Sequence, residues 1–168
     1  MRRPESTTAG AGPIRLGLRD LPVLARIAVL WPAAAVLKRR LPVDRLAHLF
    51  ESPPRGRALA PLRLARLVDG PLRRAYRRSP GYCVERSLLL FHLLRRAGEP
   101  ARLHFGVAPK PGGGLAGHAW VALRGEPVAE PRDPRLHYRT TYAYPAEPAD
   151  RQRPGYTRGA RFEAALPE

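Results

Sequence analysis

The single cysteine of this 168-residue chain, Cys83, and the later His118 are the residues whose types and order suggest chemistry. Cys83 opens an apolar helical stretch, and His118 begins a strand-like His-Ala-Trp-Val segment. Unpaired backbone N–H groups at a helix N-terminus favour a thiolate and can stabilise an oxyanion. A nearby imidazole can take the thiol proton. The pair therefore predicts a nucleophilic cysteine with a histidine as general base and then acid.

An acid beside His118 would orient its ring, and the sequence offers Glu130 and Asp133. If the hairpin after His118 has a three-residue loop, Leu123 faces Pro127 and Glu130 lies on the His118 side. A two-residue loop places Asp133 there instead. Strand alternation leaves both acids open.

Each of these residues also has a structural interpretation. A lone cysteine in an apolar helix is most often a small core residue, and a lone histidine is most often a hydrogen-bonded structural one. One cysteine and five scattered histidines show no paired ligand spacing, so we expect no metal site. The run Gly112–Gly114 lacks the Lys-Ser/Thr of a phosphate loop, and we interpret it as a mobile flap beside the site.

The helices expected around this pair come first in the chain. Residues 14–50 carry apolar side chains at helical spacing, interrupted by three prolines, and Leu62–Arg78 returns to that spacing. Val84–Ala97 is apolar on nearly all sides, which indicates a buried central helix with Gly98 as its C-terminal stop.

Beyond that helix the apolar period changes to two. Alternation predicts strands over Leu103–Val107 and His118–Leu123, the start of a third at Val128–Pro131, and a last one over Tyr138–Tyr144. The order predicts an α+β fold, in which a buried helix packs on a small antiparallel sheet after a helical N-terminal region.

Composition suggests one domain with short appendages, because 44% apolar residues can fill a single core. We expect a disordered lead-in over residues 1–13 and a helical region with its linker over 14–61. The catalytic core should span 62–144, followed by a Pro- and Arg-rich tail over 145–168.

The net charge of +16 is concentrated before the cysteine, since residues 1–78 hold 17 basic and 5 acidic side chains. The arginines do not alternate with stacking aromatics, as a single-strand binding surface requires. We therefore expect no nucleic-acid partner and interpret the basic region as a face for an acidic peptide or protein.

The most apolar run, Leu21–Leu37, has 17 residues and contains Arg26 and Pro32. A spanning helix needs about 20 predominantly apolar residues, so we expect no integral membrane segment. One cysteine cannot form an internal disulfide, and the N-terminus lacks the order of a secretory signal. These features predict a cytoplasmic protein.

Several motifs together resemble a known family. They are Tyr82-Cys83 with its Leu-rich helix, the segment Leu-Leu-Arg-Arg-Ala-Gly-Glu-Pro-Ala that ends the helix, Phe105-Gly106-Val107, His118-Ala119-Trp120-Val121, Gly125 and Glu130. The chain resembles the transglutaminase-like (papain-like) leader peptidase of lasso-peptide biosynthesis, in its stand-alone form without a fused leader-recognition domain. The similarity covers about residues 14–144 and is to the C-terminal domain of the microcin J25-processing protease.

The resemblance implies a cysteine protease that removes the leader peptide from a ribosomally made lasso precursor. The freed core amine would then be joined in a macrolactam by an ATP-dependent, asparagine-synthetase-like cyclase. It implies Cys83 as nucleophile and His118 as base. The family's acid falls twelve residues after the histidine, at Glu130, where many members have Asp; Asp133 remains the rival.

The resemblance further implies a separate small leader-recognition protein as partner and no cofactor for the cleavage. Tyr82 and Trp120, which neighbour the two candidate residues, are the expected substrate contacts. Two other functions fit the same residues. One is acyl transfer to an amine, as in a crosslinking transglutaminase, and the other is a non-catalytic basic partner-binding protein with an inert cysteine.

Overall fold

The computed structural model describes residues 15–56, 59–76, 82–147 and 150. Within them the helical elements come first and the strands last. The helical elements are the 3-10 turn η1 (Leu18–Asp20), α1 (Leu21–Leu37), α2 (Val43–Leu49), α3 (Pro61–Ala75) and α4 (Cys83–Arg96). The later elements are β1 (Ala101–Pro109), β2 (Leu115–Leu123), β3 (Glu126–Pro127), the 3-10 turn η2 (Pro134–Leu136) and β4 (Arg139–Tyr144). The predicted α+β fold is confirmed.

The strands form one antiparallel sheet in the order β3-β2-β1-β4. The hairpin of β1 and β2 is longer than predicted, because pairing continues to Pro109 and Leu115. The chain reverses over residues 110–114, where the three consecutive glycines 112–114 adopt positive φ. Pairing places His118 of β2 opposite Gly106 of β1.

The third strand differs from the prediction. It is Glu126–Pro127, paired with Ala122 and Leu123, and does not begin at Val128. The turn before it has two residues with positive φ, Arg124 at 49° and Gly125 at 87°, which is the tight hairpin geometry. After Pro127 the regular pairing ends, although the Val128 N–H still donates to the Val121 carbonyl of β2 at 2.8 Å.

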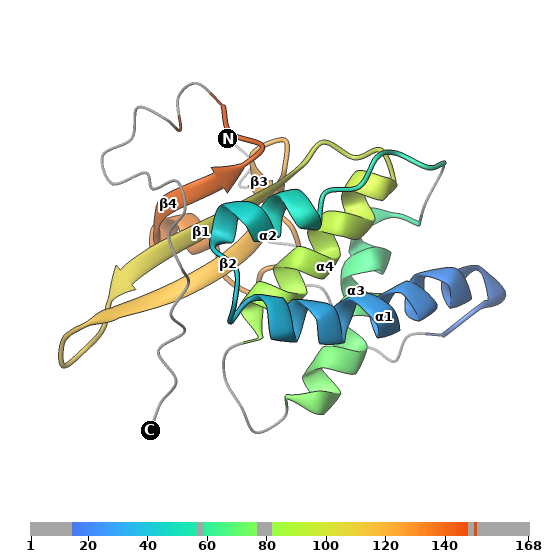
Figure 1. Ribbon diagram of the computed structural model, residues 1–168, viewed down its shortest axis with the longest axis horizontal. Helices are drawn as coiled ribbons and strands as arrows, with labels where there is room; N and C mark the ends of the chain where they lie inside the picture. Colours follow the sequence, from blue (N-terminus) through green and yellow to red (C-terminus); the bar gives the residue numbers. More distant parts are fainter. Residues whose placement is uncertain (1–14, 57–58, 77–81, 148–149, 151–168) are drawn as a thin grey trace, which may run out of the picture.

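Helix α4 occupies the centre of the molecule, between the sheet and the other helices (Figure 1). It contacts β1 and β2 on one side and α1 and α3 on the other. Among its buried side chains are those of Val84, Leu88, Phe91 and Leu94. The helix stops as predicted at Gly98, where φ is +84° and the N–H of Glu99 donates to the carbonyl of Leu94 at 3.0 Å.

Helix α1 covers the core with only part of its surface. Ile27 and Ala34 are buried, whereas Leu21 and Val29 are 56% and 70% exposed. With η1, the segment Leu18–Leu37 is long and apolar enough to cross a membrane by length and composition, although core helices can pass the same test. Only 17% of its most apolar window is buried. The absence of a membrane segment therefore stays a prediction.

Parts of the predicted organisation lie outside the described residues, namely the lead-in over 1–13 and most of the tail over 145–168. The start of the tail is described and is attached to β1 through Arg102. This side chain donates to the carbonyl of Pro145 at 3.1 Å and pairs with Glu147 and Asp150.

Candidate active site

Cys83 is the first residue of α4, and its side chain is half-buried at the end of the helix nearest β2. The Arg86 N–H donates to the Tyr82 carbonyl at 2.9 Å. By helix geometry, the preceding N–H groups have no acceptor within the helix. N–H groups of this kind, at the start of the helix that Cys83 opens, are what an oxyanion site requires.

His118 lies near both other members of the predicted triad. Its Nε2 lies 3.1 Å from Oε2 of Glu130, and the Cys83 side chain is close enough to help raise the pKa of the ring. Since Glu130 engages Nε2, the nitrogen left for the thiol is Nδ1. The His118 side chain is 23% exposed and that of Glu130 only 7%.

These contacts change the protonation of the ring. Burial opposes its charged form, but the hydrogen bonds to Cys83 and Glu130, together with their charges, outweigh burial and raise the pKa of His118 to about 9. The imidazole is therefore protonated at neutral pH. A protonated imidazole is ready to give a proton to a leaving group.

A buried serine fixes α4 against β2. The Ser87 hydroxyl donates to the carbonyl of Ala119 at 2.9 Å, and the Ser87 side chain is fully buried. Ser87 lies one helical turn after Cys83, and Ala119 follows His118 in the strand. The bond therefore sets the separation of thiol and imidazole, and the sequence analysis did not identify it.

Glu130 is the acid that contacts His118, although the loop length that was expected to place it there is not the one observed. The turn has two residues, which was expected to place Asp133 beside the histidine. That expectation fails because β3 ends at Pro127, so alternation does not extend to either acid. Asp133 instead caps η2, accepting from the Arg135 backbone N–H at 2.9 Å and from its guanidinium.

Arg86 is a second residue that the sequence analysis missed. Its Nη1 lies 2.6 Å from Oε1 of Glu130, its Nη2 donates to the carbonyl of Ala129 at 2.9 Å, and its Nε donates to Oδ1 of Asp69 at 2.6 Å. The sequence did hold a signal, because an arginine in a helix predicted to be buried on all sides needs a partner.

Trp120 is not a substrate contact, which corrects the prediction. Its side chain is 1% exposed, because its ring stacks between those of His104 and His118, at centroid distances of 5.4 and 6.0 Å. Tyr138 also stacks on the His118 ring, at 5.0 Å. Trp120 therefore supports the ring of His118 from within the sheet.

Gly106, opposite His118, provides the room for this stack. A Cβ at this position would lie 2.9 Å from the Arg139 carbonyl oxygen and 3.0 Å from Cζ3 of Trp120. Of the two expected substrate contacts, only Tyr82 remains: it is half-buried beside the thiol and stacks on Tyr76 at 5.6 Å.

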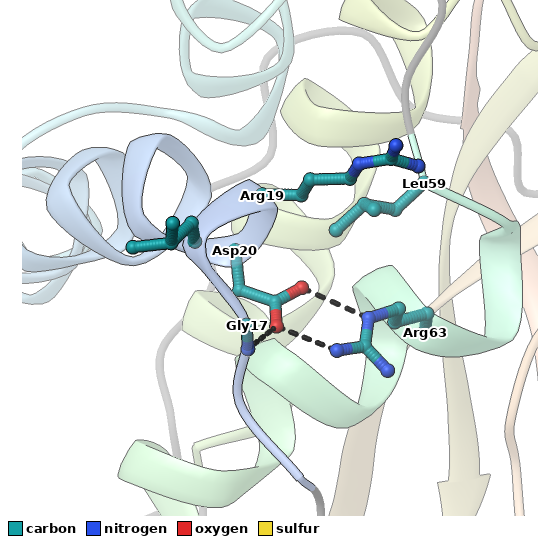
Figure 2. A pocket seen from close by; sticks show the side chains of 6 residues that line it. Gly17, Arg19, Asp20, Leu59 and Arg63 are labelled. Carbon is teal, nitrogen blue, oxygen red and sulfur yellow. Dashed lines mark hydrogen bonds and ion pairs between the residues drawn. The ribbon is translucent and has the colours of Figure 1, made fainter.

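The described residues contain no group of three or more His, Cys, Asp or Glu side chains able to hold a metal ion. A surface hollow does exist, but at the start of α1 (Figure 2). It is lined by Gly17, Leu18, Arg19, Asp20, Leu59 and Arg63. None of the candidate site residues lines it.

The α+β order, with a cysteine opening the buried helix and a histidine on the neighbouring strand, is typical of papain-like cysteine proteases and acyltransferases. A family model, the transglutaminase-like superfamily, matches residues 27–143, from α1 to β4. The chain belongs to this superfamily. Comparisons with curated proteins and with solved structures found no match.

Proposed function

We propose that the protein is a cysteine peptidase that removes the leader peptide from a lasso-peptide precursor. The observation that supports this function best is the bond between His118 and Glu130 at 3.1 Å, with Cys83 near enough to affect the pKa of the ring, within a transglutaminase-like fold. Cys83 is then the nucleophile, His118 the acid and base, and Glu130 the group that orients the ring. The resemblance of the motifs to the leader peptidases supplies the substrate class.

In the proposed reaction, the Cys83 thiolate attacks the scissile carbonyl, and the N–H groups at the start of α4 stabilise the oxyanion. The C–N bond then breaks, and the core amine leaves with the proton of His118. This gives a leader thioester. His118 next takes a proton from water, whose hydroxyl attacks the thioester and releases the leader acid and the Cys83 thiolate, with His118 again protonated.

The outer face of α1 supports the separate leader-recognition protein as partner. This face carries the exposed apolar side chains Leu18, Leu21, Val29 and Val36, and exposed Arg39 and Arg40 follow it. The hollow of Figure 2 lies at the other end of the same helix. An apolar face with arginines suits a partner that presents apolar and acidic side chains.

Introducing a negative charge on this apolar face tests the docking proposal. Val29→Glu should weaken cleavage when the recognition protein is limiting and leave Cys83 alkylation unchanged. Leu136→Glu, at an equally exposed apolar residue in η2, is the matched control. Equal effects of the two substitutions would reject α1 as the docking face.

The remaining partners follow from the same proposal. The precursor leader is the substrate, and the ATP-dependent cyclase uses the released amine. The peptidase, the recognition protein and the cyclase all act in the cytoplasm. The residues of the site carry the cleavage chemistry themselves, so the proposed reaction needs no cofactor.

Mass spectrometry of a precursor peptide, incubated with the protein and the recognition protein, tests the activity, with Cys83→Ala alongside. Free leader and free core with the native protein alone would support the peptidase. Hydrolysis adds the mass of water, whereas amine crosslinking of a glutamine side chain loses ammonia. A crosslinked product would replace the peptidase by an acyltransferase. An intact precursor, with a thiol that alkylates slowly, would indicate a binding protein.

A further inference from the structure

We propose that Arg86, held by Asp69 of α3, is a positioning residue that keeps Glu130 against His118. The inference rests on the proposed roles of Cys83 and His118 and extends them to a second layer of side chains. Arg86 makes no contact with the thiol or the imidazole in the described structure. It acts through the acid.

Arg86 is the cation that bridges the two buried carboxylates of this group, Asp69 and Glu130. Arg86, Asp69 and Glu130 are 10%, 15% and 7% exposed, so all three ionic groups are largely removed from water. Two carboxylates then face one guanidinium and one imidazolium. Without Arg86, two buried carboxylates would have only His118 to neutralise them, which is unfavourable.

The guanidinium uses a different nitrogen for each partner. Nε faces Asp69, Nη1 faces Oε1 of Glu130, and Nη2 faces the Ala129 carbonyl. Three separate donors in one plane determine both the place and the direction of the Glu130 carboxylate. Since Oε1 of Glu130 is bonded to Arg86, Oε2 is the oxygen that contacts His118.

The segment of Glu130 is attached to the sheet two residues earlier, where the Val128 N–H donates to the Val121 carbonyl at 2.8 Å, and Arg86 supports the residues that follow. Strand β3 ends at Pro127, and Ala129 adopts a φ of +53°, which a residue with a Cβ rarely does. The bond from Arg86 to the Ala129 carbonyl stabilises this backbone at the residue before the acid. Arg86 therefore holds both the side chain and the turn that delivers it.

Asp69 completes the arrangement from α3. It fixes the guanidinium from the side opposite Glu130, and its negative charge helps to raise the pKa of Arg86 against the effect of burial. Arg86 also follows Cys83 by three residues, so the two lie on the same side of the first turn of α4. One helical turn thus places the nucleophile and supports the acid.

The test uses the full chain with Arg86→Lys, Asp69→Asn and the matched control Arg95→Lys. Arg95 lies on the same helix and pairs with Glu51 at 2.9 Å, far along the helix from the thiol. A lysine keeps the charge at position 86 but cannot bond three partners in one plane. We expect Arg86→Lys to lower kcat for leader cleavage about 100-fold and Asp69→Asn about 10-fold, with KM nearly unchanged.

A second readout does not depend on the substrate. His118 faces Cys83 of α4, Glu130 and the Tyr138 ring, and its titration can be followed by NMR and by the pH profile of Cys83 alkylation. Both substitutions should lower the pH midpoint of the ring, and Arg95→Lys should leave it unchanged. In a Glu130→Gln background, Arg86→Lys should have little further effect on kcat, because the group it positions is already altered.

The inference is overturned if Arg86→Lys folds and keeps the native kcat and titration midpoint, or if its effect is equally large without Glu130. If Arg86→Lys does not fold, Asp69→Asn decides by the same criteria. A native protein that leaves precursors intact, yet shows the shifted titration in the variants, would reject the peptidase and retain the positioning role.

Discussion

Two arginine–carboxylate pairs in this molecule, Arg63 with Asp20 and Arg86 with Glu130, differ in how much of the carboxylate the arginine takes. Arg63 binds both oxygens of Asp20, at 2.9 and 2.5 Å, and the Gly17 N–H adds a third bond at 2.7 Å (Figure 2). Arg86 takes one oxygen of Glu130 and leaves the other to His118.

This difference in how the carboxylate oxygens are shared distinguishes a structural ion pair from one that can take part in proton transfer. Asp20 is saturated by donors that do not titrate near neutrality, and these bonds, first that of Arg63, lower its pKa. Glu130 shares its charge with an imidazole, so it can influence a proton that moves during a reaction. The number of ion pairs therefore says little about function. The group that shares the carboxylate with the arginine is more informative.

Glu130→Ala should produce the largest separation between the two pairs. The ring of His118 loses its orienting acid, and we expect leader cleavage to fall about 100-fold or more, within the range of general acid–base contributions. The measurement is kcat/KM with the precursor. Asp133→Ala should cost far less, because Asp133 contacts Arg135 rather than the ring. The reverse ranking of the two acids would remove Glu130 from the site.

The titration of His118 sharpens the comparison. Because its pKa is raised from 6.5 to about 9, its charge should stabilise the fold fully below pH 6.5, and this contribution should disappear as the pH rises through 9. NMR of the ring should show a midpoint near 9 in the native protein. Cys83→Ala and Glu130→Gln should each lower the midpoint, and Asp20→Asn should not change it. A native midpoint near 6.5 would contradict the hydrogen-bonded pair.

Gly106→Ala tests whether packing behind the ring matters as much as charge. The added methyl would contact the Arg139 carbonyl and the Trp120 ring, and overpacking of this kind costs about 1–3 kcal/mol of unfolding free energy. The displaced ring should lower kcat by roughly 10-fold. Gly70→Ala, in α3 with open space around it, is the control. Equal stability of the two variants would show that Trp120 adapts.

Asp20→Asn should have the smallest effect on catalysis. The Asp20 site lacks a titrating partner, so we expect native cleavage kinetics and a melting temperature lower by a few degrees. Since the pKa of Asp20 is lowered, the stability it adds is present above about pH 3.8 and is lost as the pH falls through its folded value. Denaturant unfolding of both proteins at pH 7 and in acid measures this. A loss of cleavage would link the hollow to the active site.

The sequence predicted the features that depend on local periodicity. Helix α4, its Gly98 stop and the positions of Cys83 and His118 all follow from apolar spacing and helix-end chemistry, and the structure has them where expected. Each of these signals is contained within about one element. For that reason they could be read without knowing which elements pack together.

The sequence did not reveal what depends on three elements at once. Arg86 reads as one charge in an apolar helix, and only the approach of α3 and the turn after β3 shows that Asp69 and Glu130 neutralise it. The third strand was misplaced because Ala129 adopts positive φ, which its residue type does not indicate. Trp120 was expected to be accessible to substrate. Its burial depends on Gly106 of the neighbouring strand, whose lack of a side chain leaves room for the indole ring.

The bond from Ser87 to Ala119 has a mechanical consequence. Cys83, Arg86 and Ser87 travel together on the first turn of α4, whereas His118 belongs to the sheet. The boundary between these two layers therefore runs through the candidate active site, and the Ser87 hydrogen bond connects the layers. A small slip along this boundary would separate the His118 ring from Cys83, and so abolish the proposed activity while each layer stayed intact.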